Sequence, residues 1–226
     1  MLDSLINLIY PILCFGCGNK VEKESLHICF SCKNALARHH RNFPVNDPIS
    51  KIFLGRLHLE KATAFLKFEK DGRIQTLLHA LKYKGISDIG IGLGELAALE
   101  LQEHHFFDTI DLLLPIPIHQ KKQQKRGYNQ SHFIADGIAN KTGLKIDKVS
   151  VIKKINTESQ TRKSRFERHN NVNHSFKLLN KNKLENKHIL LIDDVITTGS
   201  TIEACGNELK DIPGVRLSLL TIAYTY

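Results

Sequence analysis

The sequence has no long apolar run, and none approaches the roughly 18 residues that a membrane-spanning helix requires. Residues 1–13 also lack the basic stretch and the small-residue cleavage site of a secretory signal. We therefore expect a cytoplasmic protein without a membrane span. Because structural disulfides are rare in that compartment, the cysteines that cluster near the N-terminus indicate a metal site instead.

Two common nucleotide-binding motifs are missing or incomplete. No Gly-x-x-x-x-Gly-Lys-Ser/Thr loop occurs in the chain, which excludes a P-loop. Residues 92–97 fit a loose Gly-x-Gly-x-x-Ala pattern, but no convincing strand precedes them, so we interpret them as a helix start. Tryptophan is absent, and the aromatic residues near the candidate sites are Phe15, Phe30 and Tyr128, which is weak support for stacking on nucleic-acid bases.

Length and composition set the scale of the fold. A chain of 226 residues suffices for one α/β domain and a small appendage, and a hydrophobic content of 42% allows a packed core. The formal net charge of +9 suits an anionic ligand such as a polyphosphate, a nucleic acid or an acidic surface. Many basic proteins are merely soluble, so the charge alone does not identify the ligand.

Near the N-terminus, two Cys-x-x-Cys pairs stand eleven residues apart. The cysteines are Cys14, Cys17, Cys29 and Cys32. A tetrahedral Zn²⁺ takes four such thiolates, whereas a redox pair would need a βαβ setting that neither pair has. We predict a structural zinc site, because about forty residues do not bury enough surface to fold without a metal.

The most informative stretch spans residues 188–202. Four consecutive apolar residues, 189–192, predict a buried parallel strand, and Asp193 and Asp194 follow at its end. The loop that leads from there into a predicted helix contains Thr197, Thr198, Gly199, Ser200 and Thr201. Hydroxyls, a glycine and a helix N-terminus suit a phosphate, while two carboxylates suit sugar hydroxyls or Mg²⁺. The pattern predicts a ribose 5-phosphate site; a simple acidic turn with a helix cap would explain only one acid and one hydroxyl.

A second predicted strand, residues 111–118, runs into a basic loop before a helix that starts at about Ser131 and ends at Thr142. The cations of this loop are Lys121, Lys122, Lys125 and Arg126. Such a cluster at a strand end can hold a pyrophosphate, with Arg126 binding in bidentate fashion. The alternative is a solvated run of charge.

The rest of the chain alternates predicted helices and strands. Further strands are expected at residues 62–68, 149–155 and 215–224, and helices around residues 74–81 and 93–101. The long polar segment 156–174 contains Arg162 and Arg168, and we expect it to close as a lid over a charged substrate, unless it is a plain surface loop.

In this order, the motifs resemble the ComF-type competence protein family. The residues that carry the resemblance are the cysteine pairs, Leu81-Lys82-Tyr83-Lys84-Gly85, Pro115-Ile116-Pro117-Ile118-His119, Arg126-Gly127-Tyr128-Asn129-Gln130, Thr157, Gln160, Glu167-Arg168, Asn171-Val172 and residues 191–201. The last of these is similar to the phosphoribosyl-pyrophosphate (PRPP) motif of type I phosphoribosyltransferases. Two departures are Lys122 and Gln124, where the family usually has arginines, and Lys163, where it usually has an apolar residue.

The resemblance implies an α/β type I phosphoribosyltransferase fold, with a five-stranded, mostly parallel sheet, flanking helices and a small N-terminal zinc finger with four cysteine ligands. Apolar residues at helical spacing also predict a helix within residues 1–10. The implied domains are this N-terminal helix with the zinc module at residues 1–42, a linker at 43–60 and the transferase domain at 61–226. The implied reaction displaces Mg-bound pyrophosphate at C1 of ribose. Asp193 and Asp194 would hold the ribose hydroxyls, directly or through Mg²⁺, as the catalytic pair. No residue is recognisable as a general base, so the acceptor stays open.

The resemblance also implies the roles of the other charged residues. The loop 197–201 would bind the 5-phosphate, the four cations of the basic loop would attract pyrophosphate, and Arg162 or Arg168 would close from the lid. Two alternatives stay open: a non-catalytic PRPP sensor or partner-binding module in DNA uptake, and a protein that binds single-stranded DNA directly. The possible partners are thus PRPP or a related ribose phosphate, single-stranded DNA and DNA-uptake proteins.

Overall fold

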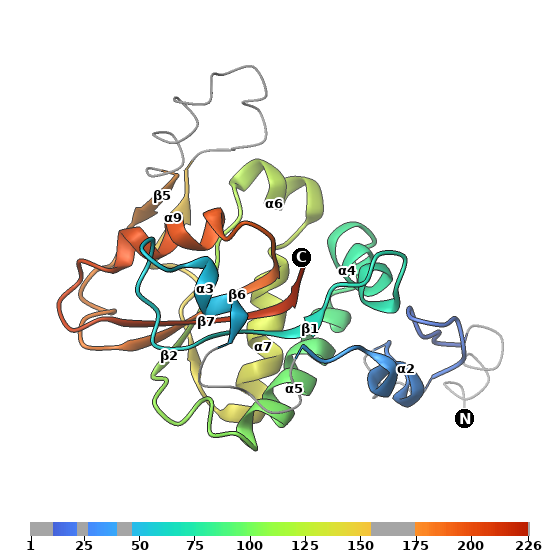
Figure 1. The fold of residues 1–226 in the computed structure, drawn as a ribbon. Helices are drawn as coiled ribbons and strands as arrows, with labels where there is room; N and C mark the ends of the chain where they lie inside the picture. The colour runs from blue at the N-terminus through green and yellow to red at the C-terminus, as the bar shows by residue number, and fades with distance from the viewer. Residues whose placement is uncertain (1–10, 22–26, 40–46, 155–174, 226) are drawn as a thin grey trace.

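The computed structural model describes residues 11–21, 27–39, 47–154 and 175–225 (Figure 1). In this part of the chain, five strands form the main sheet in the order β1-β7-β6-β2-β3, and all four neighbouring pairs are parallel. The strands are β1 (Ala62–Lys67), β2 (Leu112–Pro115), β3 (Lys145–Ile146), β6 (His188–Ile196) and β7 (Arg216–Tyr224). The predicted five-stranded sheet is confirmed, with the strand that carries the two acids at its centre.

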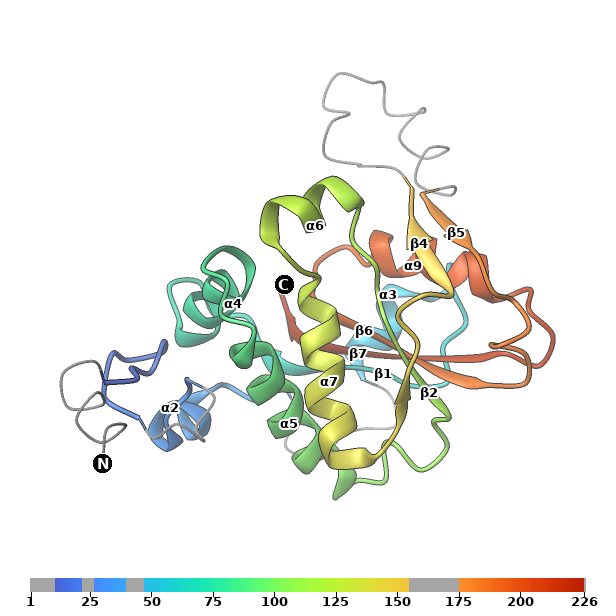
Figure 2. The ribbon, with the colours of Figure 1, turned by 180° about the vertical axis from the view of Figure 1, so that it is seen from behind.

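Helices cover both faces of this sheet (Figures 1 and 2). On one face lie α4 (Arg73–Tyr83), α5 (Asp88–Gln102) and α7 (Gln130–Thr142), and on the other α3 (Pro48–Ile52) and α9 (Ser200–Leu209). Successive side chains of a strand point to opposite faces. Leu190 and Ile192 therefore join the core under α4, α5 and α7, while Ile189 and Leu191 join the core under α3 and α9. The apolar run 189–192 is needed because both faces are buried.

Helix packing explains Gly94, the second glycine of residues 92–97. It lies inside α5, where a Cβ would come within 2.2 Å of the Ile134 carbonyl oxygen of α7. In α7, a Cβ on Gly137 would come within 2.1 Å of the Ile91 carbonyl oxygen. The two helices thus cross backbone to backbone, and this run is a packing motif within a helix.

Three local predictions need correction. The strand expected at residues 149–155 is the short β4 (Val151–Lys153), which pairs antiparallel with β5 (Phe176–Leu178) in a separate two-stranded sheet. The edge strand of the main sheet next to β2 is β3 instead, which the sequence pattern did not reveal. The basic loop contains a helix, α6 (Gln120–Arg126), because the His119 side chain accepts from the Lys121 N–H and Gly127 ends the helix at φ +84°.

The cysteine-rich module packs against the sheet domain beside α4 and α5 (Figure 1). Ile28 and Leu36, on either side of α2 (Phe30–Ala35), belong to the same core as Leu66 of β1. Arg38 forms an antiparallel bridge with Leu66, and its Nε donates to Glu100 Oε2 of α5 at 2.7 Å. The module therefore shares its apolar interior with the sheet domain.

Part of the predicted linker forms α3 and packs against β1. Asp47 caps this helix by accepting from the Ile49 N–H at 2.8 Å, and it also accepts from the Thr63 hydroxyl and contacts His39 Nε2 at 3.1 Å. Burial raises the pKa of Asp47, but these hydrogen bonds outweigh it and hold the pKa below its ordinary value. The domain boundaries at residues 42 and 60 stay a prediction.

Two predicted features fall outside the described residues. They are the helix within residues 1–10 and the lid segment 156–174 with Arg162 and Arg168. Among the helices that are described, none has the length and apolar character needed to cross a membrane.

Candidate functional site

Two carboxylates lie at the end of the central strand, as predicted, and each is held by neighbouring groups. Asp193 Oδ1 accepts from the Ser131 hydroxyl at 3.0 Å and from the Asp194 N–H at 2.9 Å. Asp194 Oδ1 accepts from the Val195 N–H at 2.7 Å, and its Oδ2 lies 2.8 Å from Lys82 Nζ. The strand itself continues to Ile196, so both acids are fixed by the sheet and not by a loop.

Asp194 lies close enough to Asp193 for its charge to affect the ionisation of Asp193. Burial and the neighbouring Asp194 charge raise the pKa of Asp193 to about 7, against the opposing effects of the Asp194 N–H, Lys82 and Ser131. Asp194 is 8% exposed and forms its ion pair with Lys82. The site at neutral pH thus holds a carboxyl that ionises readily when a cation or a hydroxyl donor arrives.

Lys82 was not among the predicted site residues, although it belongs to the Leu81–Gly85 run that supported the family resemblance. It lies near the end of α4, 24% of its side chain is exposed, and it connects the acids to a basic cavity. The only signal in the sequence was its place in that run.

The basic cavity has a volume of about 250 Å³. It is lined by Lys82, Tyr83, Lys122, Lys125 and Arg126, from the ends of α4 and α6. The Arg126 guanidinium lies 5.2 Å above the Tyr83 ring, which orients it along the cavity wall. Three of the four predicted cations are therefore brought together, while Lys121 is not among the lining residues.

The predicted phosphate loop leads directly into α9. Gly199 is the N-cap residue, with φ +75°, and has no side chain that could cap the helix; the Ser200 N–H donates to the Thr198 hydroxyl in a long contact of 3.5 Å. The hydroxyls of Thr198 and Ser200 lie 3.0 Å apart, while Thr197 and Thr201 are exposed. The first N–H groups of α9 and a set of hydroxyls are thus available to an anion.

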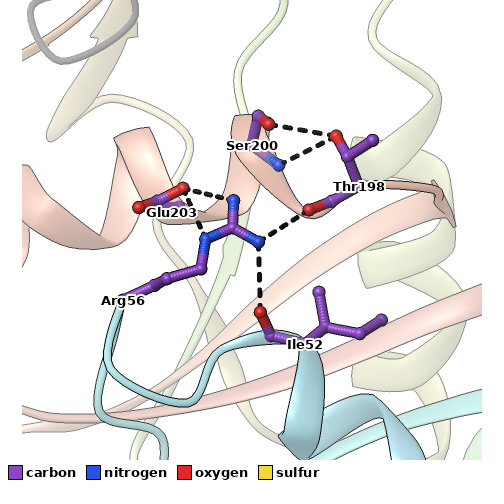
Figure 3. Close-up of polar contacts among 5 residues, drawn as sticks. All are labelled: Ile52, Arg56, Thr198, Ser200 and Glu203. Carbon is purple, nitrogen blue, oxygen red and sulfur yellow. Dashed lines mark hydrogen bonds and ion pairs between the residues drawn. The ribbon is translucent and has the colours of Figure 1, made fainter. Parts of the chain in front are cut away.

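A segment far away in the sequence supports this loop (Figure 3). Arg56 donates to the Thr198 carbonyl oxygen at 2.9 Å and forms an ion pair with Glu203 in the first turn of α9. The Phe53 ring packs behind Gly199, where a Cβ would come within 2.9 Å of ring atoms. Sequence reasoning missed both residues, because no local pattern marks them.

The Arg126–Gln130 motif organises the space between the acids and the basic cavity. The Tyr128 hydroxyl donates to the Leu81 carbonyl oxygen at 2.5 Å, next to Lys82. Asn129 Nδ2 donates to the Ile116 carbonyl oxygen at 2.9 Å, and its Oδ1 accepts from the Ser131 N–H. The segment 128–131 thus holds the end of α4 and the end of β2 in place. Through the Ser131 hydroxyl it also holds Asp193.

The four predicted cysteines form a cluster that can hold a metal ion. Their Sγ atoms all lie within 4.8 Å of one another, and those of Cys17 and Cys29 are 3.7 Å apart. Four thiolates at about 2.3 Å from a tetrahedral Zn²⁺ would be about 3.8 Å apart, so the donor set fits zinc. Burial raises the pKa of Cys14, but backbone N–H groups, first that of Cys29, outweigh it and lower the pKa to about 7.

The comparisons with known proteins cover both parts of the chain. Residues 129–222 match the phosphoribosyl transferase domain family. Competence protein F of Haemophilus influenzae is 26% identical over 88% of this chain and 85% of that protein. Competence protein ComFC of Bacillus subtilis is 25% identical over 84% of this chain and 74% of that protein. Over most of its length the chain is therefore similar to competence proteins of the ComF type. The DNA utilization protein YhgH of Escherichia coli K12 is also similar to the chain, 30% identical over 57% of each sequence.

The match to the transferase domain begins at Asn129, at the cap of α7. It includes Ser131, the two acids and the phosphate loop. Lys82, the basic helix α6 and the Arg56 segment lie before it. Two residues outside the matched domain thus contact it: Lys82 contacts Asp194, and Arg56 contacts the phosphate loop at Thr198.

Proposed function

We propose that this protein binds PRPP with Mg²⁺ and transfers its phosphoribosyl group to an acceptor, with release of pyrophosphate. The observation that carries the proposal is the junction at Lys82. Its ammonium group contacts Asp194 of the acid pair, and Lys82 also lines the basic cavity. A sugar on the acids would therefore place a diphosphate at its C1 beside the cations.

The acid pair is suited to the ribose hydroxyls. Asp193 and Asp194 can accept hydrogen bonds from vicinal hydroxyls directly or bind them through Mg²⁺. The Ser131 hydroxyl and the backbone N–H groups of Asp194 and Val195 keep the two carboxylates in position when a ligand binds. The ligand must replace Lys82 on Asp194, and a diphosphate provides the released ammonium with a new partner.

The remaining parts of PRPP match the other two elements. The loop residues Thr197, Thr198, Gly199, Ser200 and Thr201 would bind the 5-phosphate through hydroxyls and N–H groups. Lys122, Lys125 and Arg126 would bind the pyrophosphate, with Lys121 nearby in the first turn of α6, and Arg162 or Arg168 would close over it. When bound, Mg²⁺ neutralises charge on the departing pyrophosphate. Catalysis by these residues is electrostatic, because they face the charge that develops as the glycosidic bond breaks.

Thermal unfolding with and without PRPP and Mg²⁺ tests the binding. The wild type should gain several degrees at millimolar ligand, because binding to the folded state stabilises it. Asp193→Asn keeps an oxygen for the Ser131 hydroxyl but loses the charge, and it should abolish the gain. Asp136→Asn, an equivalent change on α7 where the acid pairs with Lys148, should retain it. If PRPP with Mg²⁺ leaves the melting temperature of the wild type unchanged, PRPP is not the ligand.

Turnover needs a separate measurement. Pyrophosphate release should be followed with a panel of bases, amines and nucleotides as acceptors. Release with at least one acceptor, lost in Asp193→Asn, supports a transferase. Binding without release from any acceptor favours the PRPP sensor instead.

The second candidate function is binding of single-stranded DNA or a DNA-uptake partner. It is favoured by the names of the relatives and by Tyr83, which is 61% exposed among the cations of the cavity. Tyr128, one of the three aromatic residues that gave weak support for base stacking in the sequence, is partly buried and donates its hydroxyl to the Leu81 carbonyl oxygen. Asp193→Asn should leave DNA affinity unchanged, whereas Tyr83→Ala should weaken it. The cytoplasmic location stays a prediction.

For the cysteine cluster, we propose a structural zinc ion in a module that spans residues 1–42. Chelation should remove the metal and raise hydrogen exchange in residues 11–21 and 27–39, while the central strand β6 stays protected. Metal analysis should give one zinc per chain before chelation. Unchanged exchange after complete zinc removal, in a reduced sample, would contradict the structural role.

A further inference from the structure

Arg56 makes four hydrogen bonds, and three of them join the segment after α3 to the phosphate loop and α9 (Figure 3). Its Nη1 donates to the carbonyl oxygens of Ile52 at 3.1 Å and Thr198 at 2.9 Å. Its Nε donates to Glu203 Oε2 at 3.1 Å, and its Nη2 donates to the same oxygen. The Arg56 side chain is about one-third exposed, and these partners belong to the loop, to α9 and to its own segment.

The first consequence concerns the direction of an N–H group. No cis peptide occurs in the described residues, and in a trans peptide the C=O and the following N–H point in opposite directions. Arg56 binds the Thr198 oxygen from the side of α3. The Gly199 N–H of the same peptide therefore points away from Arg56, toward the opposite side of the loop.

The second consequence is electrostatic. Glu203 lies in the first turn of α9, near the N–H groups that would receive a phosphate. A carboxylate in this position repels an anionic ligand. The ion pair with Arg56 neutralises the carboxylate and holds it by two N–H groups on one oxygen.

The same segment also supports the loop from behind. Phe53 is buried against Gly199, and Arg56 follows it by three residues. A single short stretch thus fixes the left-handed conformation of Gly199, the orientation of the Thr198 peptide and the charge of Glu203. This stretch lies outside the residues that match the transferase domain family.

We propose that Arg56 is a positioning residue for the phosphate loop. It aims the Gly199 N–H at the 5-phosphate of the ligand and cancels the repulsion from Glu203, without touching the ligand itself. The proposal rests on the proposed function, because it takes the ligand to be a ribose 5-phosphate derivative. It implies that Arg56 supports binding of the 5-phosphate end and has no effect on pyrophosphate in the basic cavity.

Calorimetric titration of the full chain tests this selectivity with three probes: ribose 5-phosphate, PRPP with Mg²⁺, and pyrophosphate with Mg²⁺. Arg56→Ala should weaken the first two by about 10- to 30-fold, the order of a lost charge-assisted contact. Pyrophosphate affinity should stay within about twofold, because its cations are on α4 and α6. Arg56→Lys should lie between wild type and Arg56→Ala, since lysine keeps the charge but not the planar fork.

A double variant separates the two roles. In Arg56→Ala/Glu203→Gln the repelling charge is gone, so ribose 5-phosphate should bind several-fold more tightly than to Arg56→Ala alone. It should still bind less tightly than to the wild type, because the Thr198 peptide is no longer anchored. A double variant that binds no better than Arg56→Ala would overturn the electrostatic role of Arg56.

The outcomes also separate this proposal from the proposed function. If neither ribose 5-phosphate nor PRPP binds the wild type, both fail. If both ligands bind the wild type and Arg56→Ala equally well, the role of Arg56 is wrong and the proposed function stands. If Arg56→Ala loses pyrophosphate and ribose 5-phosphate to the same extent, its effect is a general loss of structure, which also overturns the positioning role.

Discussion

The acidic and basic halves of the site differ in how the fold holds them. The acids at the end of β6 are embedded: Asp194 is 8% exposed, and its two oxygens contact Lys82 and a backbone N–H. The cations after β2 are on α6, a helix in which none of the residues, all of them described, is buried. Arg126 is oriented by the exposed Tyr83 ring. One half is built into the core, and the other is presented to solvent.

This difference indicates a division of labour. A buried charge is tolerated only with fixed partners, so the geometry of the acid half exists before any ligand arrives. Exposed cations are weakly constrained, and they act through a field that salt screens. We expect the acids to determine which ligand binds, and the cations of α6 to increase the affinity for any anionic ligand.

The largest expected effect is that of Asp194→Asn. It removes a charge that faces the ligand and also leaves the Lys82 ammonium without its partner. Affinity for PRPP with Mg²⁺ should fall by about 100-fold or more, the scale of a broken buried pair. Calorimetry measures it, with the exposed Asp211→Asn as the control that should bind normally. A loss of less than threefold would show that the acid half does not select the ligand.

The next effect is a pH dependence of stability caused by Asp193. Its pKa is about 7 in the folded protein, above the ordinary value of 3.8. As pH rises between these values, the unfolded state releases a proton that the folded state keeps, so the free energy of unfolding falls. Asp193→Asn should remove this fall and be more stable than the wild type at pH 8, by up to about 4 kcal/mol, but not at pH 4. Urea unfolding of both proteins at pH 4 and pH 8 measures this difference. If the free energy of unfolding changes with pH by the same amount in both proteins, the prediction is wrong.

A smaller effect on stability is expected when the Tyr128 hydroxyl, which lies between the two halves, is removed. Tyr128→Phe leaves the buried Leu81 carbonyl without its donor, which should lower the free energy of unfolding by about 1–2 kcal/mol. Tyr83→Phe is the matched control: its hydroxyl is exposed and has only a 3.5 Å contact with Arg126, so stability should not change measurably. If the two variants have equal free energies of unfolding in urea, the Tyr128 hydroxyl does not support the site.

The sequence revealed those parts of the site that are encoded locally. The strand 189–192, the two acids, the loop 197–201 and the cysteine pairs are contiguous patterns whose chemistry depends on spacing. The transferase fold followed from the resemblance that they carry, and the matched domain and relatives confirm it. The positions of these residues in the sequence were enough to predict that the acids and the loop lie at one end of the central strand.

The parts that the sequence did not reveal depend on contacts between distant segments. Arg56 reaches Thr198 across 142 residues and Glu203 across 147, and Lys82 meets Asp194 only because α4 packs beside the sheet. The helix α6 was interpreted as a loop because it has no apolar residue to show a helical period. The two-residue β3 is too short to give a strand pattern, and the antiparallel pairing of β4 with β5 joins segments that are distant in the sequence.

The smallest effects should come from single cations of α6, and their salt dependence provides the sharpest test of the contrast. Lys122→Gln or Lys125→Gln should weaken PRPP binding by about two- to threefold in 0.1 M salt, the scale of an exposed ion pair. The loss should vanish in 1 M salt, where the Debye length shortens from about 10 Å to about 3 Å. The Asp194→Asn loss should persist in 1 M salt, because that group is buried. If one lysine costs as much as Asp194 and resists salt, it binds the diphosphate directly, and α6 is as specific as the acids.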